Sequence, residues 1–276
     1  MPEGGNTVKY TKSRSRIIIR CVSLVLVACL SLFAATGVRA ADAESASALS
    51  TDVIASLTAR NNRLVEYLKE NAAQGDIRPL IDGYIGGGHF GLDSSAQNQL
   101  GKILQNRNTV ITLNSVDLGN GYSLTFLSNG TLSLDELKER QISPTDPSIT
   151  GLVSNPSSIQ GQTQYKWASN DRYEYSPLGI FLFHIHIESY FGYDGVNASY
   201  GGGLSGYYEK GGLPNPWQVS NWEVGTTIVE GGAYCRAFAR GNFHWGIEYQ
   251  GVGIVFQDVY EDVRVSVTRD GTVYKN

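Results

Sequence analysis

The second half of the chain alternates apolar and polar residues with a period of two, and this pattern constrains the fold more than any other feature. Successive side chains of a β-strand point to opposite faces of a sheet, so the alternation predicts strands with one buried face. The clearest runs cover residues 181–188, 222–228, 244–250 and 263–268. Less regular runs lie near residues 166–175, 198–208, 233–240 and 252–258. We therefore expect about eight strands in residues 165–276 and, because no helical pattern separates them, an antiparallel arrangement.

The first half of the chain has a different pattern. Leu57, Leu64 and Leu68 recur at helical spacing, and Gly75 follows as a helix stop. Further elements are expected at 93–104 (a weaker helix), 109–113 and 122–127 (short strands) and 132–141 (one or two helical turns). The predicted fold class is α+β, a short helical N-terminal segment followed by a mostly antiparallel β-sandwich or barrel-like domain. The expected organisation is a signal peptide at 1–40, a helical segment with a β-hairpin at 41–142, a linker at 143–164 and an antiparallel β-domain at 165–276.

The N-terminal forty residues have the pattern of a bacterial export signal. A basic stretch precedes an uncharged apolar run over residues 21–35, which is too short for a stable membrane span. Val38 and Ala40 provide the small residues that a signal peptidase reads, so cleavage is expected after Ala40 and the protein is expected to be secreted. The alternative is lipidation at Cys29, which ends a lipobox-like sequence, although the apolar run continues beyond it.

Removal of residues 1–40 leaves an acidic protein with one cysteine. Six of the 22 basic residues and one of the 26 acidic residues are lost, which leaves 16 basic and 25 acidic residues and a formal charge of −9. Such a surface repels phosphate backbones, so we expect no nucleic-acid partner, and no stable membrane span remains after processing. Cys235 has no partner for an internal disulfide, and it lies in a run of small residues that predicts a buried, inert thiol.

A His-x-His-x-Glu sequence is the sharpest candidate for chemistry. His184, His186 and Glu188 alternate with isoleucines, so their side chains would share one face of a strand. His244 stands at a polar position of another strand and would complete a zinc site if it converged with them. The alternative, which needs no cofactor, is a pair of histidines hydrogen-bonded to tyrosines or to Glu188.

A second candidate site combines aromatic residues with glycines. Tyr207, Tyr208, Trp217 and Trp222 follow or flank glycine- and proline-rich sequence, where exposed rings would stack on sugars or peptides. The alternative is that these rings belong to the core. The glycines from Gly83 to Gly91 lack the lysine and hydroxyl residue of a P-loop and are interpreted as a hinge.

Three function classes remain open from the sequence. The first is an exported, non-catalytic protein whose β-domain binds a cell-surface glycan, a peptide or another protein. The second is a secreted zinc-dependent hydrolase that uses His184, His186 and His244. The third is a secreted antagonistic toxin whose strands would form membrane hairpins. No H-E-x-x-H or G-x-S-x-G motif is present, and neither the ligand nor the oligomeric state follows from the sequence.

Overall fold

The computed structural model describes residues 51–71, 75–92, 94–96, 111–143, 146, 163–211, 217–249 and 252–275, with the backbone alone at 245–249 and 252–257. All of them belong to the compact unit Ser47–Asn276. The helices are α2 (Thr51–Asn71) and α3 (Ile77–Gly86), and a 3-10 turn, η2, covers Glu230–Gly232. The strands are β1 (Thr112–Gly119), β2 (Tyr122–Leu127), β3 (Leu132–Ile142), β4 (Gln164–Tyr175), β5 (Phe181–Tyr193), β6 (Ala198–Lys210), β7 (Trp217–Val229), β8 (Tyr234–Tyr249), β9 (Val252–Thr268) and β10 (Val273–Lys275).

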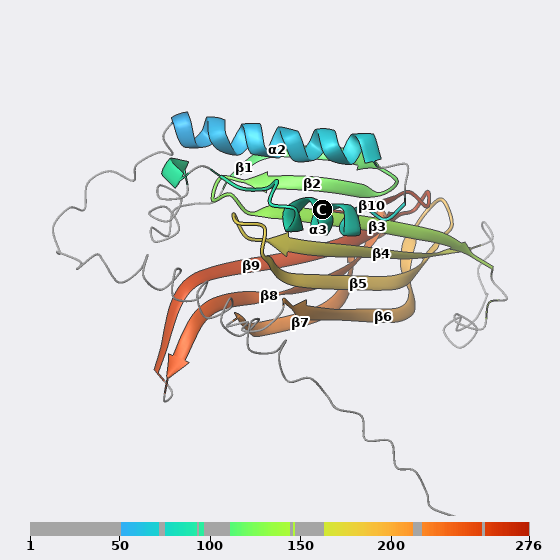
Figure 1. Cartoon of the computed structure of the whole chain (residues 1–276). Helices are drawn as coiled ribbons and strands as arrows, with labels where there is room; N and C mark the ends of the chain where they lie inside the picture. Colours follow the sequence, from blue (N-terminus) through green and yellow to red (C-terminus); the bar gives the residue numbers. More distant parts are fainter. Residues whose placement is uncertain are drawn as a thin grey trace, which may run out of the picture. The chain divides into compact units, whose positions relative to one another are not determined.

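The strands form two antiparallel sheets, as Figure 1 shows. Sheet A has the order β1-β2-β3-β4-β5-β6, and sheet B has the order β10-β9-β8-β7. The two sheets pack as a sandwich and do not close into a barrel, so the predicted α+β class is confirmed in its sandwich form.

Sheet A crosses the boundary that the sequence placed between a helical segment and a separate β-domain. Strand β3 pairs with β4 over eleven residues, from Leu132 opposite Tyr175 to Ile142 opposite Tyr165. The helical turns expected over 132–141 are therefore strand, because the partner strand lies far along the chain and its pairing overrides local propensity. The expected linker lies mostly outside the described residues, as does the helix expected at 93–104.

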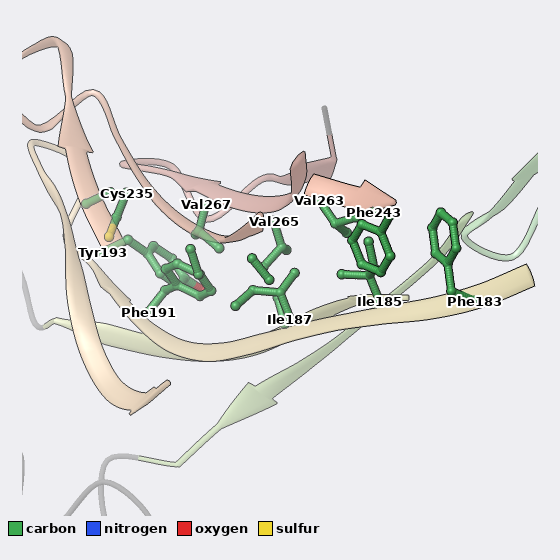
Figure 2. Close-up of a cluster of buried hydrophobic side chains, with 14 of the residues drawn as sticks. Phe183, Ile185, Ile187, Phe191, Tyr193, Cys235, Phe243, Val263, Val265 and Val267 are labelled. Atoms are coloured by element: carbon green, nitrogen blue, oxygen red, sulfur yellow. The ribbon is translucent and has the colours of Figure 1, made fainter. Parts of the chain in front are cut away.

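The space between the sheets holds the main apolar core. Phe183, Ile185 and Ile187 of β5 point toward sheet B, where they meet the valines of β9 and Phe243 of β8 (Figure 2). The rings of Phe183 and Phe243 stack with centroids 4.2 Å apart. Cys235 is buried in the same core, so the predicted burial of its thiol is confirmed, and burial raises the pKa of this thiol to about 12.

The same intersheet space becomes charged beneath β3 and β4. The Arg172 guanidinium donates to Asp135 at 2.8 Å and to Glu261 of sheet B at 3.2 Å. Glu174 accepts a hydrogen bond from the Ser133 hydroxyl. These groups are inward-facing members of the strand alternation, so charge pairing replaces apolar packing at this end of the sandwich.

The helices pack on the face of sheet A that points away from sheet B, which we call the outer face (Figure 1). Helix α2 confirms the predicted helix. Helix α3 begins at the N-cap Asp76, whose carboxylate accepts from the Arg78 amide at 3.0 Å. The hinge predicted from Gly83 onward is wrong for its first part, since Gly83 lies within α3 and its carbonyl accepts from the Gly87 amide. The helices bury one half of the outer face, which we call the helix-packed half and which comprises Leu124, Phe126, Leu132, Leu134, Tyr173 and Tyr175.

Candidate functional site

Polar side chains occupy the outer face of sheet A beyond the helix-packed half. We call this region the polar half; it comprises Asp171, His184, His186, Glu188, Tyr207 and Glu209. Because Ile185 and Ile187 point inward, the two histidines between and before them point outward, as the sequence predicted. The strand register places Asp171 opposite His186, and Tyr207 opposite His186 on the other side.

Asp171 is the centre of the cluster. Its Oδ1 atom lies 2.7 Å from His184 Nε2 and 2.7 Å from His186 Nδ1. The side chains of Asp171 and His184 are buried, and that of His186 is 12% exposed. These three residues bring one ligand atom each to within 4.8 Å of one another, so they are the described residues that could hold a metal ion.

A second carboxylate faces the other nitrogen of each imidazole. His184 Nδ1 lies 3.4 Å from Glu209 Oε2, and His186 Nε2 lies 3.5 Å from Glu188 Oε2. Glu188 also accepts a hydrogen bond of 3.2 Å from the Trp167 indole. Each ring is therefore held between two carboxylates, which fixes its orientation.

Two tyrosine rings flank the histidines. The Tyr173 ring stacks on His184 with centroids 4.3 Å apart and an interplanar angle of 9°. The Tyr207 ring stacks on His186 at 4.8 Å and 27°. Tyr173 is buried, whereas Tyr207 is 44% exposed. The cluster is thus closed on the side of the helices and open to solvent at Tyr207.

The electrostatics of the cluster follow from burial and hydrogen bonding. Burial works to raise the pKa of Asp171, but the hydrogen bonds from His184 and His186 outweigh it and lower this pKa to about 2. Burial likewise works to lower the pKa of His186, and the hydrogen bond and charge of Asp171 outweigh it and raise this pKa. Next to them on β3, Glu136 and Lys138 form an ion pair with an N–O distance of 2.7 Å.

His244 does not join the cluster, so the convergence that the alternative three-histidine zinc site requires is not present in the structure. Its neighbour Phe243 points into the intersheet core, which turns His244 to the opposite, outward face of sheet B. There His244 contacts Ser220 at 2.5 Å and Asp258 at 3.1 Å. The alternation along β8 correctly predicts a polar position for His244, but it does not indicate to which sheet β8 belongs.

The four aromatic residues predicted to form one ligand site lie on different faces of the sheets. Trp217 is buried in the intersheet core, where its ring meets Phe183 edge-on at 5.3 Å. Tyr208 and Trp222 pack against the same core and contact each other at 4.9 Å. Only Tyr207 of the four points to the outer face of sheet A, because it alternates with Tyr208 along β6.

Sequence reasoning missed Asp171, Glu209 and Tyr173. One signal for Asp171 was available, since aspartate is depleted in strands and this one lies inside an aromatic-rich strand. No comparable signal existed for Glu209, whose contact with His184 depends on the register between β5 and β6.

Comparison with protein-family models, with curated proteins and with solved structures finds no match for this chain. Among the described residues, no helix is both long enough and apolar enough to cross a bilayer.

Proposed function

We propose that this chain is an exported, non-catalytic binding protein that recognises a cell-surface glycan at the polar half of sheet A. The observation that carries the proposal is the Tyr207 ring, which is 44% exposed and shares its face of the sheet with the carboxylates of Glu209 and Glu188. Glu209 follows it on β6 with a side chain that is 61% exposed, and Glu188 lies on the neighbouring strand.

The chemistry of these groups suits a sugar. An exposed aromatic face stacks on the apolar face of a pyranose ring, and carboxylate oxygens accept hydrogen bonds from its hydroxyl groups. The Tyr207 ring is held by its stacking on His186, so little side-chain freedom is lost on binding. The acidic composition of residues 41–276 disfavours nucleic acid as the ligand.

Co-sedimentation with insoluble chitin, cellulose and bacterial cell-wall sacculi tests the proposal. We expect the protein to sediment with at least one of them, and the Tyr207→Ala variant to bind about tenfold more weakly because it lacks the stacking surface. Tyr200→Ala is the matched control, since Tyr200 lies on the same strand and is 46% exposed. Failure to sediment with any of the three, or equal binding by Tyr207→Ala, would overturn the proposal.

Export is the second part of the proposal and rests on the sequence of residues 1–40. Mass spectrometry of protein recovered from culture supernatant is expected to find Ala41 at the N-terminus. A diacylglyceryl-modified chain that begins at Cys29 would assign the protein to the membrane surface instead.

A further inference from the structure

We infer that Asp171, His184 and His186 form a binding site for one divalent transition-metal ion of the zinc type. The inference rests on the geometry of these side chains and is independent of the proposed glycan binding. Two imidazole nitrogens and a carboxylate oxygen from paired strands converge, and all three donor atoms lie within 4.8 Å of one another. Two histidines with one carboxylate form a ligand set that zinc and its neighbours in the first transition row prefer.

A count of protons around the two rings shows why a cation fits there. Four ring nitrogens face carboxylate oxygens: Asp171 faces both histidines, Glu209 faces His184 and Glu188 faces His186. In their neutral forms the two imidazoles have only two N–H groups, so two nitrogen lone pairs point at carboxylate oxygens unless protons or a metal ion take them up. One divalent cation beside Asp171 would accept both lone pairs, and the N–H groups would then donate to Glu209 and Glu188.

The glutamates lie where partners of metal-bound histidines are usually found. A histidine ligand commonly donates its second ring N–H to a carboxylate, which fixes the tautomer and strengthens the metal bond. Here both rings have such a carboxylate, at 3.4 Å for His184 and 3.5 Å for His186. The stacked rings of Tyr173 and Tyr207 hold the imidazoles in the plane that this arrangement needs.

The surrounding charges favour a cation. Asp171, Glu188 and Glu209 contribute three carboxylates in direct contact with the imidazoles. Of the basic groups on neighbouring elements, Lys138 pairs with Glu136, and Arg78 of α3 lies over the Tyr173 ring at 4.5 Å. In addition, the Ser169 hydroxyl, two residues before Asp171 on the same face of β4, is buried and has no hydrogen-bond partner in the described part of the chain.

The fit requires a small movement. Metal–ligand bonds of 2.0–2.1 Å place tetrahedral ligands about 3.3 Å apart, so the 2.7 Å contacts around Asp171 Oδ1 would have to open by about 0.6 Å. Sliding of the imidazoles against the stacked tyrosines would allow this. Nitrogen ligands disfavour calcium and magnesium, which take oxygen ligands.

The test is zinc binding by untagged full-length protein that has been stripped with a chelator, measured by titration calorimetry and by metal content after gel filtration. We expect one zinc per chain, and visible absorption of tetrahedral type when Co²⁺ replaces zinc. Asp171→Asn and His186→Gln are expected to weaken binding at least 100-fold. His244→Gln is the matched control, because it removes a histidine that also contacts a carboxylate, and it is expected to bind zinc like the parent protein.

Glu209→Gln keeps the test decisive if the buried variants fail to fold, since the Glu209 side chain is largely exposed. We expect zinc binding to weaken by about 10- to 100-fold in this variant with the melting temperature of the metal-free protein unchanged. Absence of zinc binding by the parent protein, or a loss that His244→Gln shares, would overturn the inference. Because zinc alone is the probe, this result is separate from glycan co-sedimentation.

Discussion

The two halves of the outer face of sheet A meet at β4 and differ in the chemistry of their side chains. In the helix-packed half, apolar side chains of β2 and β3 and the rings of Tyr173 and Tyr175 are buried under α2 and α3. In the polar half, Asp171 and His184 are buried nearly as deeply, yet every contact is made by a specific partner. Tyr173 joins the two halves, since it packs with the helices and stacks on His184.

This difference indicates that the helix-packed half mainly stabilises the fold. Apolar burial is non-directional and contributes in proportion to area, so any shape-compatible side chain would serve in the helix-packed half. A buried polar cluster stabilises little relative to apolar residues and loses much when one member is removed. Apolar residues would stabilise a sandwich at least as well as three carboxylates around two histidines, and this is why we propose a binding role for the polar half.

Removing the helix-packed half altogether has the largest expected effect. A truncated chain that begins at Gly161 lacks α2, α3 and β1 to β3, so β4 becomes an edge strand with Tyr173 and Tyr175 exposed and Arg172 parted from Asp135. The strand patterning alone predicts that residues 165–276 fold independently; the shared sheet leads us to expect no cooperative thermal transition by circular dichroism. A cooperative melt near that of the full chain would show that the sequence-based boundary is right.

Phe126→Ala probes the same half by a single substitution. The ring is fully buried between sheet A and the helices. Its removal is expected to lower the free energy of unfolding by about 3–5 kcal/mol, from lost burial and the cavity left behind. Urea denaturation with an unchanged slope would measure this directly. A loss below about 1 kcal/mol would mean that the helices do not pack as described.

Arg60→Met tests the one charged side chain buried deep in the described part of the helix layer. The guanidinium donates to the carbonyl oxygens of Gly130 at 3.0 Å and Pro177 at 2.7 Å, and burial, followed by the charge of Arg63, lowers its pKa to about 10. Methionine keeps the volume but removes the hydrogen bonds to both carbonyls and to the side-chain oxygen of Asn61, so we expect a loss of about 2 kcal/mol in urea denaturation. Equal or greater stability would show that burying the guanidinium outweighs its hydrogen bonds.

These residues also show which features of the fold and of the candidate site can be predicted from the sequence. Alternation in β5 predicts which side chains face the core, and it correctly places His184 and His186 together on the opposite face. It could not place Asp171 beside them or His244 away from them, because both depend on strand order and register between distant segments. Helix α3 was not predicted from the sequence, because its glycines are typical of turns. Its burial against sheet A stabilises it as a helix.

Glu174 lies at the charged end of the intersheet space, and its titration is expected to make the stability of the protein depend on pH. Burial, followed by the nearby charge of Glu261, raises its pKa well above the ordinary 4.5, against the opposing effect of Arg172 and Ser133. A raised pKa in the folded state means that folding binds a proton, so stability is lost as the pH rises through the window above 4.5 and regained as it falls.

Glu174→Gln removes this titration. We expect the parent protein to gain about 1 kcal/mol relative to the variant between pH 8 and pH 5, measured by urea denaturation at both values. The pKa of Glu261 is also raised by burial, and its charge interacts with that of Glu174, so the difference between the two proteins reports on the titration of this pair. Parallel pH profiles for the two proteins would contradict the assignment.

Tyr207→Ala is expected to have the smallest effect on stability, although it carries the proposed binding. Its ring is 44% exposed and its main contact is the stacking on His186, so the loss should be about 0.5 kcal/mol, several times less than for Phe126→Ala. Urea denaturation of the two variants side by side measures the contrast. A loss above about 2 kcal/mol would make Tyr207 a structural residue, and weaker glycan binding by the variant would then report on folding. A small loss, together with reduced sedimentation, assigns the ring to the ligand, because a side chain that the fold does not need is then needed for binding.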